Sequence, residues 1–473
     1  MLADPLVCLR EALHLRGRTG DVVAAGMWVW RSGGVKALVF VACALLLVYG
    51  QFHRTFKDAD RYGYMADIMP SDWGATNIWL DSTDCAVERS AWLAICDKDK
   101  LVPIAEHAIA DDPGHAFLLA LWAMAKGKRA TLPDVARLNT LLDTLGLLAL
   151  AGVLFAVRVW LTSLIVLWLG PVEYLGWMTT APHWAFIGMV SLAGVLPIAV
   201  AARDLGLMPR RAANAWIVAG IAFLGLATMI REAIGLMGVA VTLGIVFLLA
   251  LRPPRTGRRL GGLVLIVLLA MVAFMTPRAI VVARDLAFEM ERAQIVATHG
   301  LSHTLYLGLG FVENKWGILY HDYYGQAVAA EIDPSIVFCS PEYFQLMWKL
   351  YIGRWLEDPM EVMRIYGEKG WQLLARPTLY PGPPFGIVLL VTLLHLAASS
   401  ALGLWRRIGF VQGQVVETIC AGFFLLFLAQ AMAALPSHNY AMPVNAFVLV
   451  LLGVLIEFAA RGLLAALKTR PRS

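Results

Sequence analysis

The stretch "VKALVFVACALLLVYGQFHRTFKDADRYGYM", from Val35 to Met65, passes without a break from an apolar run into a dense group of charges. The apolar part ends near residue 51, and a bilayer is crossed by a helix of about 20 such residues. The polar part begins directly afterwards and contains Asp58 and Asp60 between basic residues. These charges fit a solvated helix exit, and they also fit a reactive site at a membrane surface.

Apolar runs of this kind recur along the whole chain. The 473 residues are 59% hydrophobic, whereas soluble domains are about 45–50% apolar even when glycine is counted. The sequence therefore predicts an all-α polytopic membrane protein with ten transmembrane helices. We expect these spans near residues 34–51, 140–157, 159–176, 183–201, 212–230, 233–251, 260–276, 386–404, 414–434 and 444–461. The third span is the weakest, because Pro171 and Glu173 interrupt it. The gap around Arg158 is very short, so the second and third spans either form a tight hairpin or one of them is re-entrant.

Basic residues predict the orientation of these spans. With ten spans, the short basic loops all fall on one side, which the positive-inside rule makes cytoplasmic. These clusters are Arg10–Lys36, Arg203–Arg211, Arg252–Arg259, Trp405–Gly409 and the tail Lys468–Ser473. The net charge of +5 comes mainly from these loops, which favours control of topology over binding of nucleic acid. Both termini are then cytoplasmic.

The same topology predicts how the chain is divided. We expect a cytoplasmic segment 1–33, a first part of the bundle 34–276 with an outward loop 52–139, a second outward region 277–385, a second part of the bundle 386–461 and a cytoplasmic tail 462–473. Helical patterns at Pro277–His299 and Glu342–Leu374, the latter broken near Asp358–Pro359, predict a small and mostly helical exoplasmic (periplasmic) cap.

Two cysteines of the first outward loop, Cys85 and Cys96, are candidates for a disulfide. Two cysteines in one external loop suit an oxidising compartment, and the alternative is a pair of buried free thiols. The cysteine spacings in the chain do not resemble a zinc site.

Catalytic chemistry, if present, is expected on the outward side. The sequence has no P-loop, no dinucleotide fingerprint and no hydrolase motif, and its cytoplasmic loops are too short for a catalytic domain. A carboxylate at the outer interface, such as Asp58 or Asp60, can act as a general base toward a hydroxyl group or help to bind a metal-bridged phosphate. Glu88 is a candidate for a second acid.

Other outward residues are candidates for binding. His299 and His303 are four residues apart and would share one face of a helix; a structural role, a metal pair and contact with a phosphate or sugar are the alternatives. No third candidate ligand lies at a sequence spacing typical of a metal site, so no metal site is assigned. The remaining candidates are Lys315 among aromatic residues, Arg231 beside Glu232 between the fifth and sixth spans, and His438 and Asn439 in the last outward turn.

The residues after the first span resemble those of the GT-C superfamily, the integral-membrane glycosyltransferases. Asp58, Arg61 and Tyr62 fit the D-x-x-R-Y spacing of the lipid A aminoarabinose transferase branch, although Ala59 replaces the adjacent Glu of that branch. Asp60 and Tyr62 fit the D-D-x-Y form of other branches, of the protein mannosyltransferase type, equally well. "RLNTLLDTLGLLAL" (residues 137–150) also resembles this superfamily. The resemblance does not choose between the two aspartates.

The resemblance implies a reaction. A sugar would arrive on a polyprenyl phosphate of the undecaprenyl type and be transferred at the periplasmic face of the bacterial inner membrane, to an acceptor glycan, lipid or protein. The enzyme would be a hexosyl- or pentosyltransferase. Asp58 or Asp60 would act as the base. The leaving phosphate, the sugar or the acceptor would be bound by Arg61, Tyr62, Arg231, His299, His303, Lys315, His438 and Asn439. Some members of the superfamily need a divalent metal, and the resemblance leaves this open.

Two other classes of membrane protein share parts of this pattern. A polymerase or ligase of the O-antigen type uses the same donors, but its sites are usually centred on arginine. A transporter or flippase usually has polar residues buried within its spans. The spans here look nearly free of such residues, with Glu457 near the cytoplasmic end of the last one, which favours the glycosyltransferase.

Overall fold

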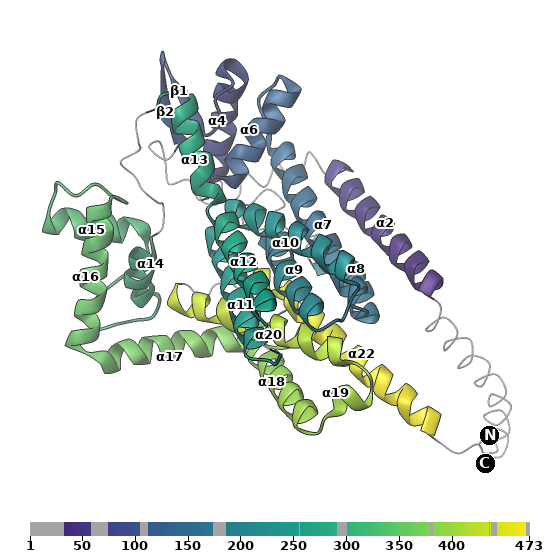
Figure 1. Ribbon diagram of the computed structural model, residues 1–473. Coiled ribbons are helices and arrows are strands. Elements are labelled where there is room, and N and C mark those ends of the chain that lie inside the picture. The colour runs from purple at the N-terminus through teal and green to yellow at the C-terminus, as the bar shows by residue number, and fades with distance from the viewer. Residues whose placement is uncertain are drawn as a thin grey trace, which may run out of the picture. The chain divides into compact units, whose positions relative to one another are not determined.

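A computed structural model describes residues 33–57, 74–104, 112–173, 186–254, 256–290, 300–378, 382–434, 436 and 442–469 (Figure 1). Apart from one short β-hairpin, the regular structure of the described residues is helical. Within these residues, eight helices have the length and apolar composition needed to cross a membrane, and two shorter helices are also apolar. The protein is therefore an all-α, multi-pass membrane protein, as the sequence predicts.

Each of the ten predicted spans coincides with a helix. They are α2 (Gly33–Lys57), α7 (Leu132–Ala156), α8 (Trp160–Glu173), α9 (Phe186–Asp204), α10 (Arg210–Ile230), α11 (Glu232–Ala250), α12 (Gly257–Phe274), α18 (Phe385–Ala401), α20 (Val411–Ala433) and α22 (Asn445–Thr469). The two shorter ones are α8 and α18. The chain divides into two compact units, residues 1–50 and 51–473, and most of α2 belongs to the first.

Helix α9 forms the centre of the second unit. It is buried along nearly its whole length and packs against α7, α10, α11, α20 and α22. Glycines let the backbones approach closely: Gly146 of α7 lies against Gly188 of α9, and Gly220 of α10 lies against Leu196. Because lipid gives apolar helices no hydrophobic reason to associate, such close contact supplies the dispersion energy that holds them together.

The interrupted third span forms the tight hairpin. Helix α7 ends at Ala156 and α8 begins at Trp160, with Arg158 between them in the left-handed region at φ +67°. Glu457 of α22 accepts hydrogen bonds from the backbone N–H and the hydroxyl of Thr162, and it forms an ion pair with Arg461. Arg461 also donates to the carbonyl of Arg158. The last span is thus tied to this hairpin.

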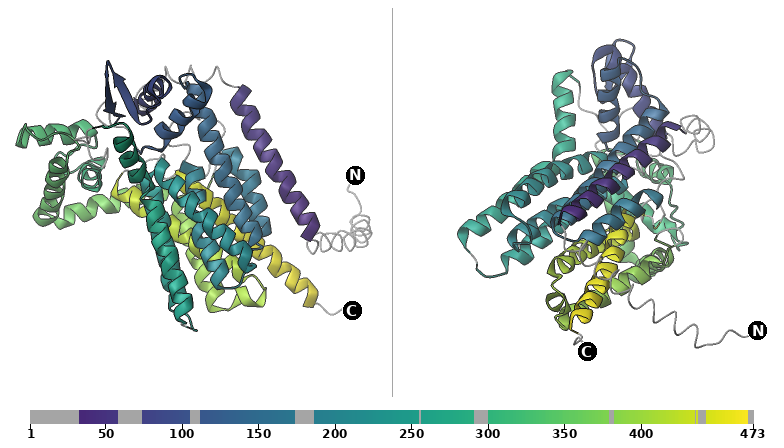
Figure 2. Two further views of the ribbon diagram at one scale, coloured as in Figure 1. Left: turned by 45° about the horizontal axis from the view of Figure 1, so that its top comes forward. Right: turned by 90° about the vertical axis from the view of Figure 1, so that its right-hand side faces the viewer.

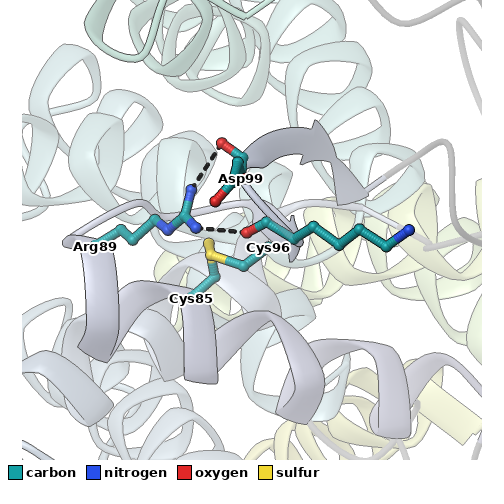
Figure 3. Close-up of a disulfide and its surroundings, with 5 residues drawn as sticks. Cys85, Arg89, Cys96 and Asp99 are labelled. Carbon is teal, nitrogen blue, oxygen red and sulfur yellow. Dashed lines mark hydrogen bonds between the residues drawn. A yellow bond between two sulfur atoms is a disulfide. The ribbon is translucent and has the colours of Figure 1, made fainter.

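The predicted cap consists of two lobes, each with its own hydrophobic core. Lobe A contains α4 (Gly74–Arg89), β1 (Ala94–Asp97), β2 (Lys100–Pro103), α6 (Gly114–Lys126) and α13 (Thr276–Ala287). The strands pair antiparallel, with Ala94 opposite Pro103. Cys85 and Cys96 form the predicted disulfide between α4 and β1, and Arg89 donates to the carbonyls of Lys98 and Asp99 in the turn between the strands (Figure 3).

Helix α13 joins lobe A although it comes from the second outward segment. Its buried Arg284 donates to the carbonyl of Leu93 at 2.9 Å, and Phe288 packs edge-on against Trp92. The sequence predicts a helix at Pro277–His299; the structure places helix at Thr276–Ala287, with Pro277 in the first turn, and residues 291–299 lie outside the described part.

Lobe B is formed by residues 300–375 (Figure 2). Its elements are α14 (Leu301–Gly308), the short η3 (Leu309–Phe311), α15 (Asp322–Ile332), α16 (Pro341–Glu357) and α17 (Pro359–Ala375). The predicted break lies between α16 and α17, where the Asp358 carboxylate accepts from the N–H groups of Met360 and Glu361 and caps α17. The lobe's core includes Tyr343 and Ile365.

Candidate active site at the cap end of the bundle

The two lobes meet the same end of the helical bundle. Lobe A leads into α7 and receives the end of α12, and its residue Gly114 lies against Met229 and Ile230 at the end of α10. Lobe B leads into α18 and contacts Ala433 and Ala434 at the end of α20. We call this end of the bundle the cap end.

Seven of the predicted site residues lie outside the described residues, and their roles stay predictions: Asp58, Asp60, Arg61, Tyr62, His299, His438 and Asn439. Their neighbours in the chain are described. Helix α2 ends at Lys57, directly before Asp58. Helix α14 begins at Leu301, two residues after His299, and α20 ends at Ala433, shortly before the turn that contains His438.

Arg231 lies in the turn between α10 and α11. Its guanidinium forms an ion pair with Asp112 of lobe A at 3.5 Å, and its side chain is 15% exposed. The second carboxylate oxygen of Asp112 accepts from the backbone N–H of Glu232 at 3.0 Å. Glu232 in turn pairs with Arg278 of α13 at 3.6 Å. Lobe A is thereby fixed to the α10–α11 turn, with a partly exposed cation in the contact.

The start of α6 connects this turn to α7. Gly114 leaves room for the backbone of Met229, which a Cβ atom would overlap. His115, the next residue, shares a 3.0 Å hydrogen bond with the side chain of Asn139 on α7 and stacks on the ring of Trp79 at 4.5 Å. His115 and Asn139 are both buried.

Helix α7 carries a buried polar face. Asn139 and Asp143 are one turn apart and therefore lie on one side of the helix. The Asp143 carboxylate accepts from the N–H of Gly188 at 2.9 Å. Because Gly188 is in the first turn of α9, the carboxyl group also lies at the positive end of that helix dipole.

These contacts form a series of pairs linked through the chain, because Asp112 and His115 flank the start of α6 and Asn139 and Asp143 lie one turn apart on α7. We call it the polar seam, and it consists of Asp112, His115, Asn139, Asp143 and Arg231. It joins the end of α10, the start of α6, the body of α7 and the start of α9, so it fixes these four helices relative to one another. Its one cation, Arg231, is a group suited to an anionic ligand such as a phosphate.

Lys369 of α17 forms a second anchor at the cap end. Its buried ammonium donates to the carbonyl oxygens of Gly308 at 2.9 Å, Ala433 at 3.2 Å and Ala434 at 2.8 Å. A cation is favourable at the carboxyl end of α20. Burial lowers the pKa of Lys369 to about 7, and the three carbonyl oxygens oppose this shift because they accept from the charged form. Lobe B is thus held where the chain leaves α20.

His303 has two partners within lobe B. Its Nδ1 lies 2.7 Å from the hydroxyl of Tyr343 and its Nε2 lies 3.2 Å from a carboxylate oxygen of Asp322. The ring is buried in the core of the lobe, where burial also raises the pKa of Tyr343. This geometry fits the structural role that the sequence left open for His303.

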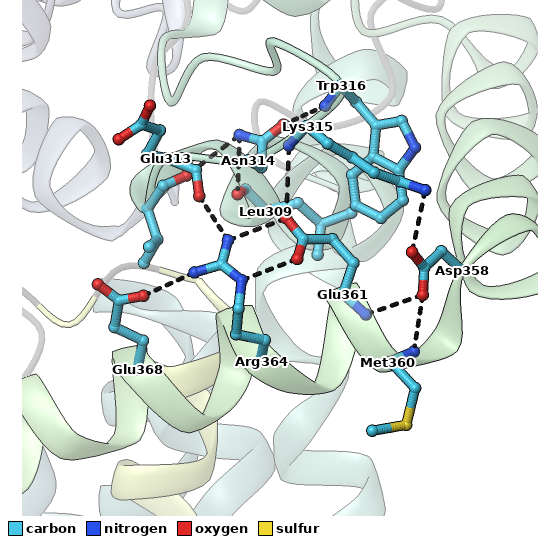
Figure 4. Close-up of polar contacts among 11 residues, drawn as sticks. Leu309, Glu313, Asn314, Lys315, Trp316, Asp358, Met360, Glu361, Arg364 and Glu368 are labelled. Carbon is cyan, nitrogen blue, oxygen red and sulfur yellow. Dashed lines mark hydrogen bonds and ion pairs between the residues drawn. The ribbon is translucent and has the colours of Figure 1, made fainter.

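Lys315 and Glu88 also lie in the lobes. Lys315 pairs with Asp358 at 3.0 Å, which raises the pKa of the lysine, and its backbone N–H faces Glu361 (Figure 4). These contacts attach the loop that contains Lys315 to the junction of α16 and α17. Glu88 is exposed at the end of α4, one turn after Cys85.

Buried ionisable residues within the spans were not expected from the sequence. Besides Asp143, Glu417 of α20 is buried and pairs with His395 of α18 at 2.9 Å, and Glu457 of α22 is buried as well. The expectation that the spans are nearly free of buried polar residues is therefore wrong. Among the described residues, no group of three or more His, Cys, Asp or Glu side chains is arranged to hold a metal ion.

Comparison with known proteins gives one structural likeness. No family model matches the chain, and no curated protein matches it. Among solved structures it is similar to the crystal structure of ArnT from Cupriavidus metallidurans in the apo state, with 15% sequence identity and a TM-score of 0.27 over 91% of this chain and 77% of that chain. A likeness at this TM-score does not establish a common fold.

We expect Asp143→Ala to destabilise the folded protein by about 1–3 kcal/mol, because the N–H of Gly188 loses its acceptor inside the bundle. Asp143→Asn keeps an acceptor oxygen and should cost less. Thermal unfolding in detergent measures the difference. Thr144→Val is the matched control, since the buried Thr144 hydroxyl has no partner in the described part of the chain. If Asp143→Ala unfolds at the same temperature as Thr144→Val, the seam does not hold α7 to α9.

Lys369 predicts a pH dependence of stability. Its pKa is near 7 in the folded protein against an ordinary value of 10.5, so the unfolded chain binds more protons between these values. The free energy of unfolding therefore rises with pH across this window. The contribution of Lys369 to this rise is lost as the pH falls toward 7. Unfolding temperatures of wild type, Lys369→Met and the exposed-lysine control Lys349→Met should show the slope reduced in Lys369→Met alone. Equal slopes in all three proteins would contradict the assignment.

Proposed function

We propose that this protein is an integral-membrane glycosyltransferase of the GT-C type, which transfers a sugar from a polyprenyl phosphate to an acceptor at the cap end. The observation that carries the proposal is the acidic D-x-x-R-Y stretch of Asp58, Arg61 and Tyr62, directly after the membrane-spanning helix α2. Of the predicted spans, none lies between this stretch and the start of lobe A and six lie between it and lobe B, which is consistent with one common side. The polar seam and Lys369 lie at the end of the bundle where both lobes meet it.

The proposed reaction is a displacement at the anomeric carbon of the sugar. Asp58 or Asp60 takes the proton of the acceptor hydroxyl, and the acceptor oxygen forms a bond to the anomeric carbon. The bond from that carbon to the phosphate oxygen breaks with inversion, and its electron pair leaves with the lipid phosphate. Arg231 is a partly exposed cation at the cap end and would stabilise the charge of this leaving group.

The other polar residues would position these groups. His115, Asn139 and Asp143 fix the helix ends beside Arg231. Lys369 fixes the end of α20, from which the turn with His438 and Asn439 follows. We keep Arg61, Tyr62, His438 and Asn439 as proposed contacts of the donor or acceptor, and we assign His303 and Lys315 to the folding of lobe B.

We further propose that the protein lies in a bacterial inner membrane, with the cap end in the periplasm and both termini in the cytoplasm. Two observations support this orientation. The Cys85–Cys96 disulfide in lobe A suits an oxidising compartment. The turns at the opposite end of the bundle, after α9, α11 and α18, carry the basic clusters, which favours a cytoplasmic location for them.

One observation favours a second candidate function, a transporter or flippase of lipid-linked glycans. Ionisable residues buried within spans often mark transport pathways, and the His395–Glu417 pair lies between α18 and α20. Reconstituted vesicles separate the two functions. A transporter would move an intact lipid-linked sugar across the bilayer and lose this activity in Glu417→Gln, whereas a glycosyltransferase would release the lipid.

We expect Asp58→Asn or Asp60→Asn to lower the release of polyprenyl phosphate by about 10²-fold or more, since a general base contributes that much. The purified protein would be supplied with a panel of radiolabelled polyprenyl-phosphate sugars and an acceptor fraction from the cell envelope. Asp67→Asn, in the same stretch but outside the motif, is the matched control. If both motif variants release the lipid at the wild-type rate, the proposed base is wrong.

A further inference from the structure

Helix α17 has an exposed apolar stripe that no other part of the described chain covers. Met360, Met363 and Trp371 recur on one side of the helix, and Leu356, four residues before Met360 at the end of α16, is exposed as well. Their exposed fractions are 68%, 48%, 74% and 82% in that order. A soluble surface rarely concentrates apolar side chains in this way. We call these four residues the stripe.

The opposite side of α17 is buried in the protein. Val362 and Ile365 belong to the core of lobe B, and Lys369 and Leu373 follow on the same side of the helix. The stripe therefore faces away from lobe B. Figure 1 shows α14, α15 and α16 on one side of α17 and α18 running away on the other.

Contacts with two spans fix the level of α17 relative to the membrane. The ammonium of Lys369 contacts Ala433 and Ala434, where the span α20 ends. At the carboxyl end of α17, the carbonyl of Arg376 accepts from the N–H of Phe385, the first residue of α18, at 2.9 Å. A helix that touches the end of one span and the start of the next lies at the bilayer surface.

Apolar surface continues from the stripe toward the lipid. Helix α18 exposes Ile387, Leu390 and Leu394 along its length, as a helix in contact with lipid does. The charged residues Glu361, Arg364 and Glu368 of α17 lie on the flank of the helix beside the stripe. Arg364 pairs with Glu361 and Glu368 and donates to the carbonyl of Glu313 in lobe B (Figure 4). The stripe itself contains no charged residue.

We propose that α17 lies in the plane of the membrane interface, with the stripe inserted among the acyl chains of the leaflet at the cap end. The occupant of this surface is lipid: an amphipathic helix held at the bilayer surface binds it with its apolar face. Trp371 suits this depth, because tryptophan is enriched at the boundary between acyl chains and headgroups. The insertion would hold lobe B against the membrane beside the end of α20.

A fluorescent label tests this placement in the full chain. Cys8, Cys43, Cys339 and Cys420 would be replaced by Ser, the Cys85–Cys96 disulfide kept, and a single NBD label introduced at Met363→Cys in the stripe or Glu368→Cys on the flank. The two positions are matched controls, since Met363 is 48% exposed and the Glu368 side chain 44% exposed. The labelled proteins would be placed in nanodiscs of phosphatidylcholine, with thermal unfolding confirming that each is folded.

We expect the label at position 363 to emit at shorter wavelength than the label at position 368. Lipids with a nitroxide near the headgroup end of the acyl chain should quench the label at 363 several-fold more than aqueous iodide does. The label at 368 should show the reverse preference. The pattern should persist when part of the lipid is replaced by anionic phosphatidylglycerol, because the stripe is apolar.

Three results would overturn the proposal. Iodide quenching at 363 equal to that at 368 would mean that water covers the stripe. Protection of position 363 from both quenchers would mean that a protein partner or a second copy covers it. A pattern that appears only with anionic lipid would mean that charge, and not apolar insertion, holds α17 at the membrane.

Discussion

The structure depends on the absence of water in the bilayer core. A backbone N–H or C=O group there must find its partner within the protein, which limits each crossing segment to a helix. The same condition applies to side chains, and three buried carboxyl groups in the spans each have a defined partner. Asp143 meets the first turn of α9, Glu417 meets His395, and Glu457 meets Thr162 and Arg461.

Polar contacts at the cap end then connect the lobes to the bundle. Lobe A is attached through Asp112 and His115, which join the α10–α11 turn to α7. Lobe B is attached through Lys369, whose ammonium occupies the carboxyl end of α20. Because these attachments involve particular residues of the bundle, each places a lobe relative to particular helices. An enzyme acting on a lipid-linked substrate needs such an arrangement, since its reacting groups must be held at the height of the lipid phosphate.

Structural features that depend on the composition of many residues, such as the membrane spans, are predicted well from the sequence. All ten spans coincide with helices, because a run of about 20 apolar residues is a strong signal. The break before Pro359 and the Cys85–Cys96 disulfide follow from local chemistry and are confirmed. The division into two lobes could not be predicted, since it depends on Arg284 of α13 reaching Leu93, 191 residues away in the chain.

Single residues in the candidate site were harder to predict. Asp143 is one acid in an apolar run and Lys369 is one lysine in a charged helix, and neither differs in sequence from a residue without such contacts. Arg231 stands beside Glu232 in the sequence, whereas the structure pairs it with Asp112, 119 residues away. Partners that are distant in the chain leave no local pattern.

The central claim is that the cap end binds the phosphate of a polyprenyl-phosphate sugar. A cryo-electron microscopy structure of the protein in nanodiscs with polyprenyl phosphate tests it most directly. We predict density for the phosphate at the cap end, in contact with Arg231 and with the segment that contains Asp58 to Tyr62. A lipid phosphate bound instead at the opposite end of the bundle, or beside the His395–Glu417 pair, would contradict the account.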